Sequence, residues 1–229
     1  MRGMRVIGVI PAYNEESSIA DVLRACLPYL DRIVVVDDGS SDQTAQAAGL
    51  DGICVLQHPL NRGQGAALRT GTQAALKLGA DVILHLDADG QHDPQNIPKM
   101  IEPIANGQAD VVFGSRFLGI DPTGMPTGRR WLLRGIRLFN VMVLGIPKNM
   151  TDPQSGLRAM SAEAAQRINF HQDRMAHASE ILRFVTRSDL RWQEVPAHIR
   201  YTEDSLRKGQ KATNVFSIVW HLFVGLFTK

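Results

Sequence analysis

The stretch VILHLDADGQ, residues 82–91, decides the fold class. Its first five residues form a short, mostly apolar run of the kind that makes a buried strand, and two aspartates follow closely. Similar β-branched runs occur before and after it, with helical patterns between them. This alternation predicts an α/β fold, doubly wound around a mostly parallel sheet. The expected strands are residues 5–10, 33–36, 53–56, 82–86 and 111–114.

Helices are expected between these strands, beginning near Glu15, Asp42, Gly63 and Pro94. We predict that Asn14 caps the first helix and that Glu15 and Glu16 lie in its first turn. In the second half of the chain we expect a loop over the sheet at 119–128, helices at 129–144, 161–168 and 175–187, and a strand at 194–201.

The composition bounds the function. The chain has 229 residues, 44% of them hydrophobic, which is enough for one sizeable core. Its 25 Lys and Arg against 23 Asp and Glu give a net charge of +2, which argues against a nucleic-acid partner. Cys26 and Cys54 lie in apolar stretches without metal-ligand spacing, so we expect buried, reduced thiols and a cytoplasmic location. We expect no secretory signal, and no run reaches the roughly 20 apolar residues of a spanning helix.

Polar segments follow each of the first four expected strands. In a parallel sheet these points share the carboxyl edge, where open α/β sheets bind ligands. We therefore predict that four segments converge on one crevice, namely residues 11–15, 37–40, 61–63 and 87–89.

Asp87 and Asp89 are spaced so that both can present oxygens toward one point. Oxygen ligands suit a hard divalent ion, Mg²⁺ or Mn²⁺, which offsets the charge of a departing diphosphate. The alternative is that one aspartate caps the next helix while the other is solvated. Asp38 is a candidate to accept hydrogen bonds from a base or ribose, and Tyr13 to stack on a base. Turn formation and loop anchoring are their respective alternatives.

Gly63-Gln64-Gly65 begins like a dinucleotide-binding fingerprint, but Leu68 occupies the third small position. The turn also follows the third strand instead of the first. We therefore expect no nicotinamide site, and we interpret the glycines as allowing close approach of the loop.

Seven motifs span nearly the whole chain: IPAYNEE (10–16), VVVDDGSSDQT (34–44), NRGQGAALRTG (61–71), DADGQHDP (87–94), GSRF (114–117), TDPQSGLRAMS (151–161) and IRYTEDSLRKGQKATN (199–214). In order and spacing they resemble the family-2, A-fold inverting glycosyltransferases. Within that family the similarity is to the dolichyl-phosphate mannose synthase and polyprenyl-phosphate glycosyltransferase branch.

The resemblance implies an A-type nucleotide-diphospho-sugar transferase fold and assigns roles residue by residue. The donor would contact Pro11, Tyr13, Glu15, Val36, Asp38, Asp87 and Ala88. Asp89 and Gln91 would ligate the metal, Mg²⁺ or Mn²⁺, with Asp87 close by as a third member of the metal site.

Three basic residues, Arg116, Arg130 and Lys208, would face phosphate groups of donor or acceptor, and a solvated face is the alternative for each. The chain also departs from the family pattern at two positions. Gln64 stands where many relatives carry Lys, which would remove one cationic contact. Ser188 replaces the glutamine of the processive-synthase signature, so transfer of a single sugar is favoured over chain extension.

Asp152, Asp89 and Arg116 are the predicted catalytic residues. Inversion requires an acceptor oxygen to attack from the face opposite the leaving diphosphate. A phosphate monoester is already anionic at neutral pH and needs positioning more than a base, so Asp152 is expected to orient the acceptor. Its alternative role is a turn-forming Asp before Pro153.

We therefore expect an enzyme that moves one sugar from a GDP- or UDP-linked donor to a polyprenyl or dolichyl phosphate. Residues 1–211 would form the catalytic domain. Residues 212–229 would form an apolar helix lying peripherally on the cytoplasmic face of a membrane, with Trp220 at headgroup level. Packing of this helix on protein is the alternative. The competing functions are transfer to a soluble glycan or protein hydroxyl, and silent binding of a nucleotide sugar.

Overall fold

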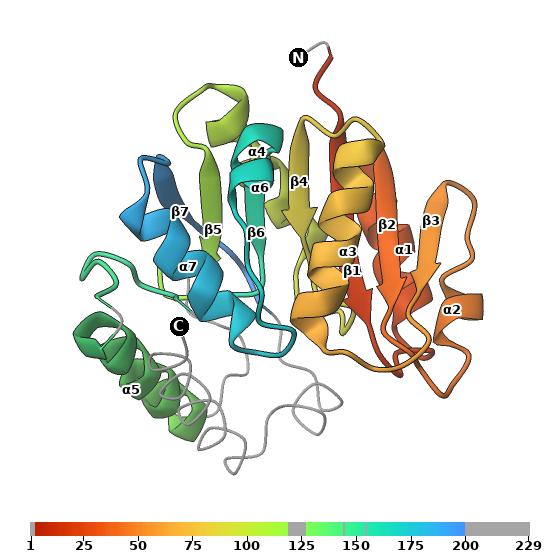
Figure 1. The fold of residues 1–229 in the computed structure, drawn as a ribbon, viewed down its shortest axis with the longest axis horizontal. Helices are drawn as coiled ribbons and strands as arrows, with labels where there is room; N and C mark the ends of the chain where they lie inside the picture. The colour runs from red at the N-terminus through yellow and green to blue at the C-terminus, as the bar shows by residue number, and fades with distance from the viewer. Residues whose placement is uncertain (1–2, 119–126, 144, 154, 200–229) are drawn as a thin grey trace.

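The computed structural model describes residues 3–118, 127–143, 145–153 and 155–199. Its centre is a seven-stranded sheet in the order β3-β2-β1-β4-β6-β5-β7 (Figure 1). The strands are β1 (Val6–Ala12), β2 (Arg32–Asp37), β3 (Ile53–Gln57), β4 (Val82–His85), β5 (Val111–Ser115), β6 (Arg158–Ser161) and β7 (Trp192–Pro196). Every residue of β1 is buried, as expected for an inner strand covered on both faces.

The sheet is mixed because of β6. This strand pairs antiparallel with β4 and β5, whereas the other described strand pairs are parallel. The expectation of a mostly parallel α/β sheet is confirmed, but β6 itself was not predicted. Its four residues are too few, and too polar at Arg158, to show a strand pattern. The pairing with β4 brings residues 155–158 beside the carboxyl end of that strand.

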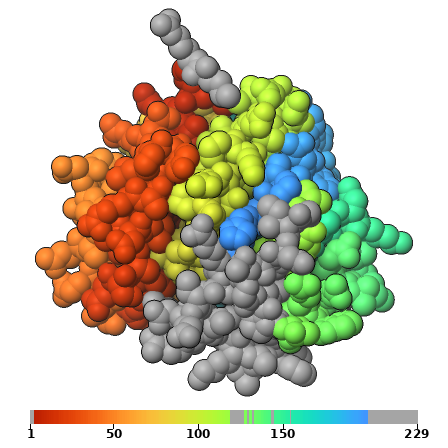
Figure 2. Space-filling model, turned by 180° about the vertical axis from the view of Figure 1, so that it is seen from behind, coloured from red at the N-terminus to blue at the C-terminus, as the bar shows by residue number. Residues whose placement is uncertain are grey.

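Helices cover both faces of the sheet (Figure 1), and Figure 2 shows the surface of the molecule from behind. One face carries α3 (Gln64–Lys77), α6 (Ala162–Arg167) and α7 (His177–Arg187), and the other carries α1 (Ile19–Cys26) and α4 (Ile97–Ala105). The shorter elements are α2 (Thr44–Ala47), η1 (Leu27–Tyr29) and η2 (Pro94–Asn96).

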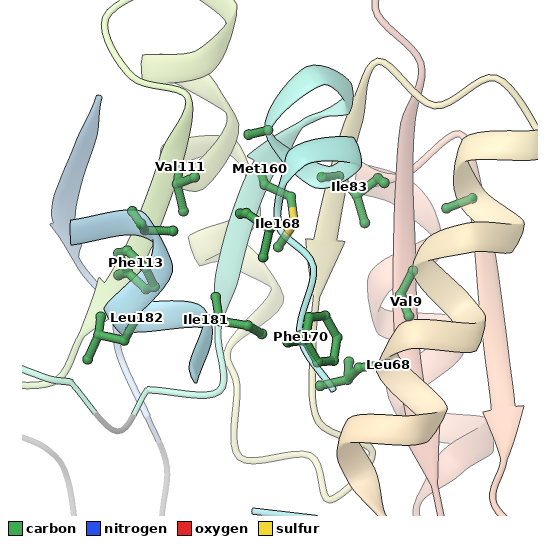
Figure 3. Close-up of a cluster of buried hydrophobic side chains, with 14 of the residues drawn as sticks. Val9, Leu68, Ile83, Val111, Phe113, Met160, Ile168, Phe170, Ile181 and Leu182 are labelled. Atoms are coloured by element: carbon green, nitrogen blue, oxygen red, sulfur yellow. The ribbon is translucent and has the colours of Figure 1, made fainter. Parts of the chain in front are cut away.

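The face under α3, α6 and α7 buries an apolar cluster that includes Ile83, Phe113 and Met160 (Figure 3). Helix α3 lies so close to the sheet that a Cβ on Gly71 would come within 2.3 Å of a Val9 methyl group. The glycine therefore permits this contact. Close packing holds the start of α3 at the carboxyl edge, where the site forms.

Helix α5 (Thr127–Val143) lies off both faces of the sheet, beyond the carboxyl ends of the strands (Figure 1). A hydrogen bond of 2.7 Å from Arg137 Nε to the Met150 carbonyl ties it to the body of the protein. Trp131 and Met142 remain 66% and 74% exposed. Across the described ranges, no helix has both the length and the apolar character needed to cross a bilayer.

The first helix begins at Ile19 with Ser18 as its N-cap, not near Glu15. Asn14 instead takes a left-handed conformation (φ 55°), and its side-chain oxygen accepts a hydrogen bond of 2.9 Å from the Ser41 N–H. The capping prediction was wrong because Asn14 bridges two loops, and both glutamates precede the helix.

The strand expected at 194–201 runs from Trp192 to Pro196. Its end is consistent with proline having no N–H to continue the ladder. Cys26 is buried, Cys54 is half-buried, and both are free thiols. The predictions for Lys208, for segment 212–229 and for most of the 119–128 loop lie outside the described residues.

Candidate active site

Asp87 follows β4 at the carboxyl edge, and its carboxylate is held from two sides. Oδ1 accepts a hydrogen bond of 2.8 Å from Gln64 Nε2 at the start of α3. Oδ2 lies 3.1 Å from His92 Nε2. Gln64, a departure from the family pattern, is thus a direct partner of Asp87. His92 was not predicted, although it stands within the quoted DADGQHDP motif.

Gly156 leaves room for this carboxylate. A Cβ at position 156 would lie 2.5 Å from Asp87 Oδ2. The contact follows from the β4–β6 pairing, in which His85 is opposite Arg158, so that Gly156 falls opposite Asp87. Any larger residue there would displace the carboxylate.

Asp89 is only partly buried, and its Oδ1 accepts a hydrogen bond of 3.0 Å from the Gln91 N–H. Burial and the negative charge of Asp87 raise the pKa of Asp89 to about 6. Burial also acts to raise the pKa of Asp87, but the hydrogen bond and charge of His92 and the charge of Arg158 hold it below its ordinary value. We call Asp87 and Asp89 the acidic corner. Neighbouring hydrogen bonds and positive charge compensate the negative charge of Asp87, whereas the charge of Asp89 is poorly compensated.

The acidic corner fits a divalent cation. Two carboxylates that repel each other both gain from a positive ion beside them. In the described part of the chain, no cluster of three or more His, Cys, Asp or Glu side chains is arranged to hold a metal ion. Mg²⁺ and Mn²⁺ commonly bind through one or two carboxylates and take further oxygen ligands from water and substrate phosphates. The assignment of Asp87, Asp89 and Gln91 to the metal stays a prediction.

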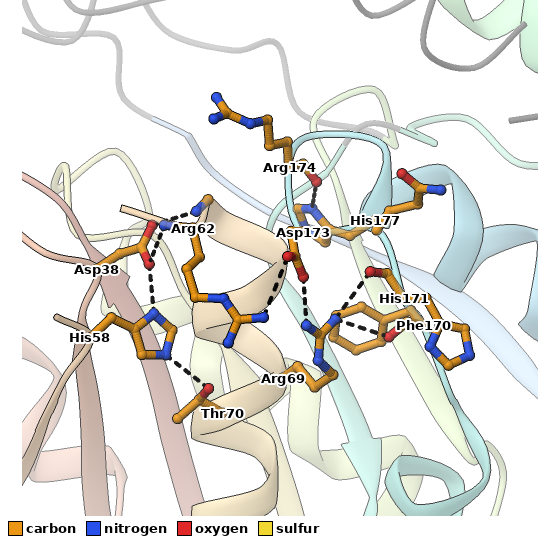
Figure 4. A network of polar contacts seen from close by, with 12 residues as sticks. Asp38, His58, Arg62, Arg69, Thr70, Phe170, His171, Asp173, Arg174 and His177 are labelled. Carbon is orange, nitrogen blue, oxygen red and sulfur yellow. Dashed lines mark hydrogen bonds and ion pairs between the residues drawn. The ribbon is translucent and has the colours of Figure 1, made fainter. Parts of the chain in front are cut away.

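The loops after β2 and β3 meet through Asp38 (Figure 4). Its buried carboxylate accepts hydrogen bonds from the N–H groups of Arg62 (3.1 Å) and Gly63 (2.6 Å). His58 Nδ1 lies 2.6 Å from the same carboxylate, and its Nε2 lies 2.9 Å from Thr70 Oγ1. These contacts use most of the roughly four acceptor positions of a carboxylate. The predicted bond to a base or ribose would use what remains.

The loop after β1 reaches the same edge. The Glu15 N–H donates to Thr44 Oγ1 at 2.7 Å. Tyr13 is 48% exposed, which leaves its ring available to stack on a base. Pro11 and Val36 are paired in the sheet and buried, so the Val36 side chain belongs to the core and only its backbone could face a nucleoside.

The four predicted segments therefore meet. Asp38 binds the 61–63 loop, and Gln64 next to that loop binds Asp87. The first segment joins the second through the Asn14 N–H, which donates to Ser40 Oγ at 2.9 Å. Ala88, between the two aspartates, is buried.

A fifth segment, residues 170–174, lies against the start of α3 (Figure 4). The Asp173 carboxylate pairs with Arg69 at 2.5 Å. A Cβ on Gly65 would lie 2.2 Å from the Gln172 carbonyl oxygen, so glycine allows this close approach. The interpretation of the glycines is confirmed, with another part of the chain as the neighbour.

Arg116 and Asp152 pair with each other. Arg116 Nε donates to Asp152 Oδ2 at 2.6 Å, Nη2 donates to Oδ1 at 2.7 Å, and the Arg116 N–H donates to Oδ2 at 3.1 Å. Arg116 is 7% exposed and Asp152 is 2% exposed. In a bidentate pair this deeply buried, both carboxylate oxygens are engaged rather than available for a substrate proton.

Glu194 on β7 supports this pair and was not predicted. Oε1 accepts a hydrogen bond of 2.8 Å from the Asp152 N–H, and Oε2 accepts one of 2.8 Å from the Thr151 N–H. The Thr151 hydroxyl lies 2.5 Å from Ser115 Oγ at the end of β5. Glu194 lies beside Asp152 because β7 pairs with β5, and no local pattern in the sequence predicts that pairing. Arg130 lies on α5, and its contact with phosphate stays a prediction.

Fold and site together define the class, a nucleotide-diphospho-sugar transferase of the A type. Residues 9–168 match the model of glycosyl transferase family 2, and the chain belongs to this family. It is 32% identical to the UDP-N-acetylglucosamine–dolichyl-phosphate N-acetylglucosaminyltransferase of Methanococcus voltae, covering 94% of each chain. It is 35% identical to the undecaprenyl-phosphate mannosyltransferase of Micrococcus luteus, covering 72% of this chain and 70% of the relative. The family and the polyprenyl-phosphate branch expected from the motifs are confirmed.

The fold also matches a solved structure. The crystal structure of glucosyl-3-phosphoglycerate synthase from Mycobacterium tuberculosis in complex with Mn²⁺ and UDP-glucose gives a TM-score of 0.72. The match covers 99% of this chain and 79% of that chain, at 21% sequence identity. At this identity the likeness shows the fold alone.

Proposed function

We propose that this chain is a metal-dependent enzyme that transfers one sugar, with inversion, from a UDP- or GDP-linked donor to a polyprenyl phosphate. The observation that carries the proposal is the acidic corner, where burial and Asp87 raise the pKa of Asp89 to about 6. The two relatives named above act, by their names, on dolichyl or undecaprenyl phosphate and carry different sugars. These names support a polyprenyl phosphate as the acceptor, but they do not identify the sugar that this chain transfers.

The donor would bind with its diphosphate at the acidic corner and its nucleoside beside Tyr13 and Asp38. Mg²⁺ or Mn²⁺ held by Asp89 would supply positive charge to the diphosphate as it leaves the sugar carbon. Gln64 and His92 hold Asp87 in place through hydrogen bonds of 2.8 and 3.1 Å. The protein thus orients one carboxylate and leaves the charge of the other for the ion.

The state of Asp152 favours a phosphate acceptor. A hydroxyl acceptor needs a base to take its proton, whereas a phosphate monoester is already anionic. The Asp152 oxygens accept three hydrogen bonds from Arg116, so we assign Asp152 the task of holding that guanidinium. Arg116 would then orient a phosphate group of the acceptor or donor.

Helix α5 supports peripheral binding to a membrane within the same proposal. Trp131, Leu138 and Met142 recur at helical spacing and are 66%, 60% and 74% exposed. The helix has four arginines and no acidic residue, and the Arg134 guanidinium lies 5.3 Å from the Trp131 ring centroid. Exposed apolar side chains beside arginines fit the interface of a bilayer that contains anionic lipid.

The enzymatic test uses purified protein, Mn²⁺ or Mg²⁺, a panel of UDP- and GDP-sugars, and a short-chain polyprenyl phosphate. We expect a glycolipid with a single sugar, inverted anomeric configuration by NMR, and no product when EDTA is present. Equal transfer to water-soluble glycans in the absence of lipid would contradict the polyprenyl phosphate acceptor and favour the hydroxyl alternative.

The membrane test is vesicle flotation. Replacing Trp131 and Met142 together by Ser is expected to lower binding to vesicles with anionic lipid. Leu60→Ser, which alters a side chain 64% exposed on another part of the protein, is the matched control. Equal flotation of the α5 double variant and the control would remove α5 from the proposal.

A further inference from the structure

Arg158 is a buried side chain beside the acidic corner that no step above uses. It is 3% exposed, and in the sheet it stands opposite His85, whose Nε2 lies 2.9 Å from Thr72 Oγ1 on α3. Its Nη2 donates to the Ser155 carbonyl at 3.2 Å. Nε and Nη1 are buried and have no hydrogen-bond partner among the described residues. A buried guanidinium with so few partners is unfavourable for folding, which points to a role in function.

The histidines near Arg158 do not alter its charge. Burial and the charge of Arg158 hold the pKa of His85 well below its ordinary value and lower the pKa of His177 to about 4. Both imidazoles are therefore neutral at pH 7. Burial lowers the pKa of Arg158 only to about 10, so the guanidinium stays positive. The carboxylate whose charge acts on it is Asp87.

The sheet geometry explains how this charge reaches the acidic corner. Arg158 is the first residue of β6 and is paired with His85, the last residue of β4. Gly156 and Asp87 lie two residues beyond this pair, at the edge of the sheet, and a Cβ on Gly156 would lie 2.5 Å from the Asp87 carboxylate. The positive charge therefore lies one residue pair deeper than the edge where a diphosphate and a metal ion would bind.

We propose that Arg158 is the resident counter-charge of the acidic corner, weakening the binding of a divalent ion to the empty site and strengthening that of a diphosphate. This inference rests on the proposed metal-dependent function. A fixed positive charge repels a divalent cation and attracts phosphate oxygens. The ion would then bind mainly together with the diphosphate.

Charge and structural damage predict different results when Arg158 is replaced. Removing a repelling charge tightens the binding of the ion alone, and removing an attracting charge weakens the binding of a metal-free diphosphate. A distorted pocket would weaken both. The opposite signs of the two changes are therefore the signature of the proposed role.

The variants separate charge from shape. Arg158→Gln removes the charge but keeps a donor for the Ser155 carbonyl, and Arg158→Lys keeps the charge as the matched control. Mn²⁺ binding to the nucleotide-free protein is measured by electron paramagnetic resonance. Binding of UDP and GDP in EDTA is measured by calorimetry. For Arg158→Gln we expect Mn²⁺ to bind about tenfold tighter and the diphosphate about tenfold more weakly, with Arg158→Lys within about twofold of the wild type.

Unchanged or weaker Mn²⁺ binding by Arg158→Gln would overturn the inference while leaving the proposed function intact. If the wild type binds no Mn²⁺, with or without a nucleoside diphosphate, the metal-dependent function fails and the inference fails with it. Arg158→Met is a second neutral variant, and the same two titrations decide the matter if Arg158→Gln does not fold.

Discussion

Two carboxylate regions at the carboxyl edge of the sheet differ in how fully the protein satisfies them. Asp152 is 2% exposed and accepts three hydrogen bonds from Arg116. In the acidic corner, by contrast, Asp89 accepts a hydrogen bond from the Gln91 N–H, and its pKa is raised to about 6 by burial and by Asp87. The protein therefore compensates the negative charge of Asp152 fully and that of Asp89 only in part.

The largest expected effect, on the rate of sugar transfer, comes from removing the negative charge of Asp89. Asp89→Asn should lower kcat for sugar transfer by about 10³-fold, because a neutral amide no longer holds the metal that stabilises the leaving diphosphate. Asn keeps an oxygen that can accept the Gln91 N–H, so the loop should persist. Steady-state kinetics with saturating Mn²⁺ measure the loss. Transfer at more than a tenth of the wild-type rate would show that the acidic corner does not hold the catalytic ion.

Substitutions in the Arg116–Asp152 pair should lower the free energy of unfolding. Arg116→Met leaves Asp152 buried without its partner and should lower the free energy of unfolding by about 3–5 kcal/mol. Adding Asp152→Leu to the same protein should restore most of the loss, because no unpaired charge remains. Urea denaturation measures both variants.

The control is Arg191→Met, which breaks an ion pair of 2.7 Å with Asp110 where the arginine side chain is 58% exposed. Its expected cost is below about 1 kcal/mol. A similar cost for Arg116→Met and Arg191→Met would mean that burial adds nothing to the inner pair.

Gly156→Ala tests the space that the acidic corner needs. The new Cβ would lie 2.5 Å from Asp87 Oδ2, so the carboxylate must move and kcat/KM should fall roughly 10²-fold. Gly135→Ala on α5 is the control, because among the described residues its Cβ would meet no atom within 4 Å apart from the adjacent backbone of its own helix. That change should stabilise the protein by about 0.5–1 kcal/mol and leave transfer intact. Equal activity of both variants would argue against a fixed position for Asp87.

The smallest effect is in the pH profile. At subsaturating Mn²⁺, activity should fall as the pH drops below about 6, because protonated Asp89 cannot ligate the ion.

The stability of the metal-free protein should change with pH in the opposite direction. The folded-state pKa of Asp89 lies above its ordinary 3.8, so this carboxyl stabilises the metal-free protein at low pH and loses that contribution as the pH rises through about 6. Thermal unfolding in EDTA should therefore show Asp89→Asn to be more stable than the wild type at pH 7.5. An unchanged melting temperature there would contradict the raised pKa.

The same contrast shows what sequence reasoning can reach. Asp38 and Asp87 were placed at the correct edge because each follows a β-branched run, and that signal is local. Gly156 and Arg158 gained their roles from β6, which four residues cannot reveal by periodicity. Glu194 depends on the long-range pairing of β5 with β7.

Asn14 illustrates a different limit. A short polar residue before a helical pattern satisfies the rule for an N-cap, yet here it accepts a hydrogen bond from Ser41 in the next loop. The contact between Asn14 and Ser41 outweighed the local preference of Asn for an N-cap position. This contact joins the loops after β1 and β2 at the candidate site.

The most direct test of the central claim is a crystal structure with Mn²⁺ and a nucleoside diphosphate, recorded at the manganese absorption edge. The account predicts one anomalous peak in the crevice, bonded to an Asp89 oxygen and to the diphosphate, with Asp87 still held by Gln64 and His92. A peak remote from Asp89, or diphosphate bound in the crevice with no manganese beside it, would contradict the account.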